Sequence, residues 1–151
     1  MSNITVRKAI AADLEALTLL FDQYRVFQGK ESDLPGARLF LQQRFERLES
    51  IVFMAHEGLA PLGFAQLYPS FSSTSLARVF VLNDLFVREE GRRKGVASKL
   101  LAAVEGFAWA EGAARVTLNV AIDNAAGQAL YEAQGWRRDA EFFMYHRFPA
   151  A

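Results

Sequence analysis

The stretch from Val79 to Ala108 changes its hydrophobic period half-way along, which limits the folds open to the chain. Residues 79–87 are β-branched and aromatic with few breakers, so they predict a buried strand. Apolar residues then recur at the spacing of one helix face, at Ala97, Leu100, Leu101, Val104, Phe107 and Ala108. A short basic loop joins the two halves, and this strand-loop-helix unit is typical of an α/β protein.

The loop between this strand and helix has a composition that suits an anion. It carries Arg92, Arg93 and Lys94 between two glycines, Gly91 and Gly95. Such a loop directs several backbone N–H groups at one point, where the helix dipole and the unpaired first-turn amides favour negative charge. The loop therefore predicts a ligand that carries phosphate. The alternative is a solvated basic turn before an ordinary crossover helix.

Length and composition indicate one domain over residues 1–151 with a single proper core, since 52% of the residues are hydrophobic and thirteen are Phe. No internal repeat or linker supports a second domain. The 17 basic and 17 acidic side chains cancel, so no global field drives the protein onto nucleic acid or an anionic membrane. Any recognition of phosphate is expected to be local.

Several classes of chemistry are excluded by content. The chain has no cysteine, which removes disulfides, thiolate metal sites and a cysteine nucleophile. His56-Glu57 lacks the second histidine of a zinc helix, and no Gly-x-Ser-x-Gly elbow is present, so we expect neither a metal nor a serine nucleophile. Without a signal peptide or an apolar run of membrane-spanning length, the expected location is the cytoplasm.

The remaining pattern predicts ten elements in the order β-α-α-β-β-β-α-β-α-β, a mixed central sheet flanked by helices. Expected strands begin near residues 4, 51, 62, 78, 116 and 138, the last covering 138–148 as one or two strands. Expected helices run from 14 to a stop at Gly29, from a cap at Ser32 or Asp33, from Gly95 to Gly112, and over 125–134. Residues 69–75 are expected to form a polar loop.

Three motifs in this order carry a family resemblance. They are Asp84-Leu-Phe-Val87, then Arg92-x-x-Gly95-x-Ala97, and then Asn124 followed by Leu130-Tyr131-Glu-Ala-Gln-Gly135-Trp136. Together they resemble the GCN5-related N-acetyltransferase (GNAT) superfamily, which uses acetyl coenzyme A, and the element order fits over nearly the whole chain. The resemblance implies that coenzyme is bound by Leu85, Phe86, Val87, Arg92, Arg93, Lys94, Gly95, Val96, Ala97 and Asn124.

The chemistry of these residues agrees with a pyrophosphate loop. Gly95 permits close approach and unusual φ/ψ values, and the small side chain of Ala97 leaves room beside the helix start. A nucleoside-triphosphate loop competes poorly, because Val96 stands where that loop needs lysine. Asn124 has two possible roles, as a coenzyme contact or as an ordinary helix N-cap.

The resemblance also implies that Tyr131 is the general acid. Transfer to an amine expels a thiolate with a pKa near ~8.5, and a phenol with a pKa near ~10 can supply its proton. The alternative is that Tyr131 only packs its helix. Polyamine-type relatives carry a glutamate where this chain has Asn83, so the base is open among four candidates, which are Asp84, Glu57, Glu141 and His146.

The acceptor site is expected from the first two helices, their connecting loop and the loop at 68–74. The candidates mix aromatic and acidic side chains that suit an amine on an apolar stem, namely Tyr24, Phe27, Glu31, Asp33, Tyr68 and Phe71. Phe21-Asp-Gln-Tyr-Arg25 and the stretch 66–73 resemble a branch that acts on polyamines, small amines and histone tails, which implies a homodimer.

Two functions from different classes follow. The first is an acetyl-CoA-dependent N-acetyltransferase that acts on a primary amine of an amino acid, polyamine or lysine-like acceptor by direct transfer in a ternary complex. The second is a non-catalytic coenzyme-A-binding regulatory module. Nucleic-acid binding has a single basic tripeptide, Arg92 to Lys94, in its favour within a neutral chain.

Overall fold

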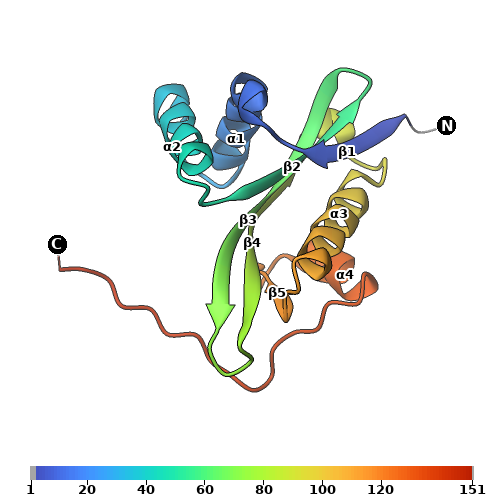
Figure 1. The fold of residues 1–151 in the computed structure, drawn as a ribbon. Coiled ribbons are helices and arrows are strands. Elements are labelled where there is room, and N and C mark those ends of the chain that lie inside the picture. Colours follow the sequence, from blue (N-terminus) through green and yellow to red (C-terminus); the bar gives the residue numbers. More distant parts are fainter. Residues whose placement is uncertain (1–2, 151) are drawn as a thin grey trace. The chain divides into compact units, whose positions relative to one another are not determined.

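The computed structural model describes residues 3–150, and Figure 1 shows its fold. The backbone forms two compact units that divide after Asn119. The first unit contains a five-stranded sheet in the order β1-β2-β3-β4-β5, with neighbours antiparallel except for the parallel pair β4 and β5. Its strands are β1 (Ile4–Lys8), β2 (Ile51–Glu57), β3 (Ala60–Ser72), β4 (Ala77–Val87) and β5 (Arg115–Thr117). Its helices are η1 (Ala11–Asp13), α1 (Leu14–Phe27), α2 (Leu34–Glu46), η2 (Glu89–Gly91) and α3 (Val96–Ala110), and the second unit contains α4 (Ala125–Ala133).

The helix boundaries follow from capping chemistry. The carboxylate of Asp33 accepts a hydrogen bond from the Gly36 backbone N–H at 3.0 Å and caps α2, with Pro35 in the first turn as predicted. Beyond the end of α1, Gly29 has a φ of 91°, a conformation that a side chain would oppose.

Two apolar cores cover the two faces of the sheet in the first unit, with α1 and α2 on one face and α3 on the other (Figure 1). The core under α1 and α2 contains Leu17, Leu20, Phe21, Leu41, Val52, Met54, Phe64 and Phe86. On the other face, the Phe107 ring of α3 lies 5.7 Å from the Phe53 ring and 5.4 Å from the Phe80 ring. The helices therefore cover both sides of a sheet of nearly continuous apolar strands.

A bulge in β4 shapes the middle of the sheet. Gln66 pairs with Asp84 and Leu67 pairs with Leu82, so Asn83 is an extra residue without a partner on β3. Side chains alternate along a strand, and Phe86 of the core under α1 lies two residues from Asp84. The bulge therefore leaves Asp84 and its partner Gln66 on the face that α1 covers.

The structure corrects three expected boundaries. β3 continues to Ser72, so residues 69–72 pair with β4 instead of forming a loop. β5 has only three residues, Arg115–Thr117. Residues 138–148 form no strand, because α4 is the only regular element described in the second unit and offers no ladder to pair with. The predicted fold class, a mixed sheet flanked by helices, is confirmed by the five-stranded sheet and its helices.

Within residues 3–150, no helix is both long enough and apolar enough to span a bilayer.

Candidate active site

The loop between β4 and α3 exposes backbone N–H groups at a helix start. Gly95 precedes α3 with a φ of 74°, and Arg93 also has a positive φ, 65°. The hydrogen bond from the Lys99 N–H to the Gly95 carbonyl, at 3.1 Å, closes the first turn of α3. The amides of Val96 and Ala97 lie ahead of that bond, where an α-helix provides no partner for them. They therefore point toward the space in front of the helix.

Three contacts hold the loop in this shape. The Lys94 ammonium lies 3.0 Å from the carboxylate of Glu57 on β2. The Nε of Arg92 donates to the Val87 carbonyl at 3.2 Å, and its guanidinium lies 5.4 Å from the centre of the Phe27 ring. The loop is thus tied to the sheet on one side and to the end of α1 on the other.

This loop fits a pyrophosphate. A Cβ added to Gly95 would meet no heavy atom within 4 Å, so the approach to the helix start is open. The side chains of Arg92 and Arg93 are exposed and add positive charge at the same place. Backbone amides, the helix dipole and two guanidinium groups together suit a ligand with adjacent phosphates.

A buried polar cluster lies on the face that α1 covers. Asp84 is only 5% exposed, and its carboxylate accepts hydrogen bonds from Gln66 Nε2 at 2.9 Å and from Asn83 Nδ2 at 3.0 Å. The Tyr24 hydroxyl is a third donor to it. Burial outweighs these donors and raises the pKa of Asp84 above its usual value. Asp84 is therefore a better proton acceptor than an exposed aspartate.

Tyr68 belongs to the same cluster. Burial, with the Asp84 charge as the second cause, raises its pKa to about 12, while Arg44 of α2 opposes the shift. The Tyr24 ring lies 5.7 Å from the Phe64 ring and 5.8 Å from the Phe86 ring. The structure thus places two predicted acceptor residues, Tyr24 and Tyr68, beside one predicted base.

The other predicted acceptor residue on α1 connects this cluster with the phosphate loop. The Phe27 ring lies 6.0 Å from the Phe86 ring and also beneath the Arg92 guanidinium. A series of ring contacts therefore runs from Arg92 through Phe27 and Phe86 to Tyr24, which donates to Asp84.

The turn between α1 and α2 is ordered by a carboxylate. The buried side chain of Asp22 accepts from the Ser32 hydroxyl at 2.6 Å and from the Asp33 N–H at 2.8 Å. Asp33 caps α2, so its carboxylate serves the helix start, while Glu31 is exposed and its backbone carbonyl accepts from Arg25 at 3.3 Å. Asp33 thus has a structural role in this turn.

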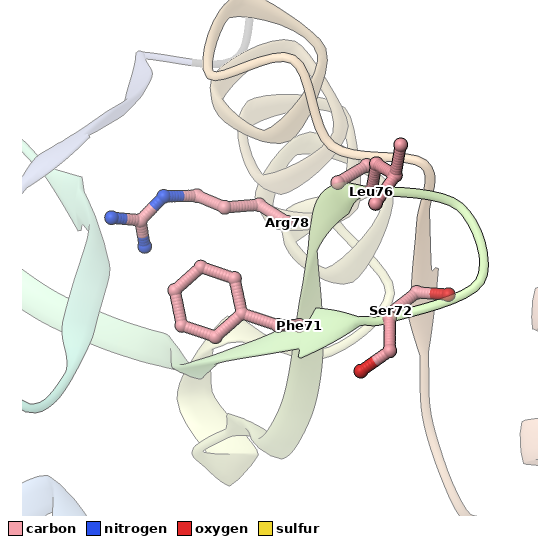
Figure 2. A pocket seen from close by; sticks show the side chains of 6 residues that line it. Phe71, Ser72, Leu76 and Arg78 are labelled. Atoms are coloured by element: carbon pink, nitrogen blue, oxygen red, sulfur yellow. The ribbon is translucent and has the colours of Figure 1, made fainter.

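Phe71 lies apart from the other predicted acceptor residues. It is three residues beyond Tyr68 on β3, so its side chain projects from the opposite face of the sheet. There its ring lies 5.2 Å from the Arg78 guanidinium, and it lines a hollow of about 400 Å³ with Ser72 and Leu76 (Figure 2).

The second unit carries the predicted acid. Tyr131 is on α4 with its ring 6.1 Å from the Trp136 ring, and burial raises its pKa above the usual value. The Asn124 side chain accepts from the Gly127 N–H at 2.9 Å and is the N-cap of α4. The His146 ring lies 6.1 Å from the Phe148 ring, and the Glu141 N–H donates to the Asp139 carboxylate at 2.9 Å.

The residue that sequence reasoning missed is Gln66. It is the only strongly polar side chain in the apolar run 62–68, and that interruption is the signal that could have found it. The side chain is fully buried and bonds directly to Asp84. Its pairing depends on the bulge at Asn83, which the sequence does not indicate.

Comparison with known proteins decides the family. The profile of the acetyltransferase (GNAT) family matches residues 15–136. The chain belongs to the GNAT family. An uncharacterized N-acetyltransferase of Bacillus subtilis strain 168, YhfO, is 42% identical to this acetyltransferase over 142 residues, which cover 94% of this chain and 95% of YhfO.

Solved structures agree with this assignment. The crystal structure of a probable acetyltransferase is 40% identical to this GNAT protein and superposes with a TM-score of 0.92, covering 97% of this chain and 99% of the other. The aminoglycoside N-acetyltransferase AAC(6')-Iy, solved in complex with CoA, shares the fold with a TM-score of 0.78 at 21% identity, covering 97% and 96% of the two chains. This GNAT protein is an acetyltransferase, and acetyl-CoA is its cosubstrate.

Proposed function

We propose that this protein transfers the acetyl group of acetyl-CoA directly to the primary amine of a small molecule, within a ternary complex. One observation carries the proposal: a buried carboxylate, Asp84, lies on the face where Tyr24 and Phe27 are, and Phe27 in turn contacts Arg92 of the phosphate loop. The family profile matches residues 15–136, most of the chain, which supports a single catalytic domain.

The residues divide into three roles. The amides and cations from Arg92 to Ala97 bind the pyrophosphate, with the backbone of Leu85, Phe86 and Val87 beside the rest of the coenzyme. Acetyl-CoA supplies an activated acyl group on sulfur. Asp84 accepts a proton from the acceptor amine, and Tyr131 donates one to the departing thiolate, so that an N–C bond replaces an S–C bond. Lys94 holds Glu57 in an ion pair at 3.0 Å, which favours Asp84 over Glu57 as the base.

The proton balance explains why a base is needed. An alkylammonium has a pKa near ~10.4, so producing the free amine at pH 7 costs about 4.6 kcal/mol. A carboxylate whose pKa is raised by burial reduces the free energy of this proton transfer, since it holds the proton more tightly than an exposed aspartate does.

The test is release of thiol from acetyl-CoA over a panel of alkylamines, polyamines, amino acids and lysine peptides. We expect turnover with at least one amine, and we expect Tyr131→Phe to lower kcat at least ~100-fold while leaving the acetyl-CoA affinity unchanged. Tyr145→Phe is the matched control, because it removes the same hydroxyl elsewhere in the second unit. An unchanged rate in Tyr131→Phe would remove Tyr131 from the acid role.

A non-catalytic coenzyme-binding module is the second candidate, and Asn83 favours it, because it stands where polyamine-type relatives carry glutamate. Persistent coenzyme binding with no thiol release over the whole panel would establish it. The polyamine and histone-type branch and the homodimer are proposals from the sequence resemblance, and the cytoplasmic location is a proposal from the sequence pattern alone. Sedimentation of the intact protein tests the homodimer.

A further inference from the structure

The second unit ends in an extended arm, residues 137–150, whose apolar side chains are largely exposed. The arm follows α4 and contains no helix or strand (Figure 1). Five large apolar side chains within seven residues are between 68% and 90% exposed, namely Phe142, Phe143, Met144, Tyr145 and Phe148. Single exposed apolar residues are ordinary on a protein surface, but a contiguous group of this size marks an interaction site.

The side chains of the arm are arranged as in a buried strand. In an extended backbone Phe142, Met144 and Phe148 share one face, and Phe143 and Tyr145 share the other. Apolar residues on both faces are typical of a strand inside a sheet that helices cover on both sides. The backbone of residues 142–148 forms no hydrogen bond within the part of the chain that the structure describes, so its N–H and C=O groups are available for a strand ladder.

The outer edge of β5 lacks a neighbouring strand. β5 is the last strand of the sheet and pairs with β4 on one side only. It ends at Thr117. The alternation of a strand nevertheless continues further along the chain, since Val116, Leu118 and Val120 are partly buried while the residues between them are exposed. A partner on the outer edge would allow a longer strand here, because strand limits depend on pairing.

The two edges of the sheet differ in charge. β1, at the opposite edge, carries exposed Arg7 and Lys8, and charged side chains on an edge strand oppose pairing with another chain. β5 has one charged residue, Arg115, at its first position, and residues 116–122 are uncharged. The edge of β5 is therefore the one open to a further strand.

We propose that the arm of one molecule pairs as a strand with the outer edge of β5 in a second copy of this chain, and that the second copy returns its own arm in the same way. Among residues 3–150, β5 pairs only with β4 and the arm pairs with no strand, so each molecule has a free strand and a free sheet edge. Exchange about a twofold axis gives both a partner and closes the assembly, so that no open polymer forms.

The area that the arms offer is sufficient for a stable dimer. Each arm contributes five large apolar side chains, and covering ten of them at ~150 Å² each would bury on the order of 1,500 Å². Specific protein interfaces bury about 1,200–2,000 Å². The exchange goes beyond the transfer reaction and gives the proposed homodimer a defined interface.

The first test uses the absence of cysteine from the chain, which removes any background in thiol cross-linking. Thr117→Cys marks β5 and Met144→Cys marks the arm. A short bismaleimide added to the double variant should shift it to the mass of two chains on a denaturing gel. Cross-linked peptides at the mass of one chain would show that the arm pairs with its own β5, and would overturn the exchange.

Two further variants control for other contacts. Leu59→Cys lies in the turn between β2 and β3 and is 98% exposed in the parent, so with Met144→Cys it should give no shift in mass. Met144→Cys alone should give none either. A dimer band from Met144→Cys alone would mean that two arms pair with each other, and equal bands in the Leu59 and Thr117 pairs would mean random collision. Either result refutes the proposal.

The second test separates strand pairing from side-chain packing. Met144→Pro removes a backbone N–H from the middle of the arm, and a proline is not tolerated inside a sheet. Met144→Leu keeps the N–H and a similar volume. We expect Met144→Pro to raise the dimer dissociation constant at least ~100-fold in sedimentation, and Met144→Leu to change it less than ~3-fold. A monomeric parent protein, or equal behaviour of the two variants, contradicts the exchange.

These measurements follow association and not thiol release, so the two proposals can fail separately. A monomer that releases thiol from acetyl-CoA refutes the exchange and supports the enzyme. An arm-exchanged dimer that releases no thiol over the whole amine panel supports the exchange and refutes the enzyme.

Discussion

Asp13 and Asp84 differ in the protonation state that the folded protein favours. Asp13 receives two hydrogen bonds from the Arg7 guanidinium, at 2.7 and 2.8 Å, and one from the Ile10 N–H at 2.8 Å, which lower its pKa to about 2. Asp84 receives only neutral donors in a buried place, and its pKa rises. Ionised Asp13 therefore stabilises the fold, whereas the ionised form of Asp84 is disfavoured by burial, as suits the base that we propose.

The first prediction concerns Asp13 and acid stability. The folded-state pKa lies below the unfolded value of 3.8, so the contribution is complete above that pH and is lost as the pH falls toward about 2. We expect Asp13→Asn to lower the free energy of unfolding at pH 7 by about 1–2 kcal/mol. The difference between wild type and variant should shrink between pH 4 and pH 2 in denaturant titrations.

Glu15→Gln is the control for Asp13. It breaks an exposed pair, Arg38 with Glu15 at 2.6 Å, in which both side chains face solvent. We expect its effect to stay below about 0.5 kcal/mol. An equal loss in both variants would show that charge alone, and not the capped and doubly bonded geometry of Asp13, matters.

At the residue scale, the sequence named candidate site residues by residue type and position, and the structure shows where they lie. Tyr24, Phe27 and Asp84 were candidates for their residue types and positions, and the structure gathers them on one face. Gln66 was missed because its importance arises from pairing across a bulge. Phe71 was predicted to line the acceptor site and instead lies on the other face, because the strand continues through a segment whose serines indicated a loop.

Among the elements, the segment from β4 to α3 is a strand, a loop and a helix, as the sequence predicted. Gly95, just before the helix, has a positive φ. Gly112, at the far end of α3, has the same φ of 74°, and a Cβ added there would likewise meet no heavy atom within 4 Å. These two glycines differ in what lies in front of them. Gly95 faces the first-turn amides, whereas Gly112 ends the helix.

The paired glycines give the next prediction. Gly95→Glu and Gly112→Glu should cost similar stability, about 1–2 kcal/mol each, because both force a side chain into the left-handed region. Only Gly95→Glu should weaken acetyl-CoA binding, at least ~10-fold, because it places a carboxylate against the phosphates. Titration calorimetry with CoA measures the affinity of each variant. Equal affinities in the two variants would refute the assignment of the loop as the pyrophosphate site.

The elements that were predicted poorly share a physical cause. Strand limits depend on pairing, which local composition does not record. The residues at 69–72 join β3 because β4 runs beside them, despite their turn-forming serines and proline. The aromatic segment 138–148 has strong strand propensity but no partner strand among the described residues of its own unit, 120–150, so propensity alone does not make it a strand.

For the molecule as a whole, the element order and the family resemblance predicted a GNAT acetyltransferase, and the family profile and the mixed sheet confirm that assignment. The acceptor could not be predicted from the sequence, because it depends on which polar groups converge in three dimensions. The sheet of the first unit has one face for α3 and one for α1 and α2, and the buried polar cluster interrupts only the second.

The contact between Arg92 and Phe27, at 5.4 Å, has a kinetic consequence. Ordering the phosphate loop also orders Phe27, which we propose lines the amine site, so we expect acetyl-CoA to bind before the amine in a compulsory order. Linkage requires that the amine raise the affinity for CoA by the same factor as CoA raises the affinity for the amine.

Phe27→Ala should bring that factor close to one in paired calorimetric titrations, whereas Phe71→Ala, on the opposite face, should leave it intact. Product inhibition patterns of the two enzymes would then differ, from ordered in the wild type to random in Phe27→Ala.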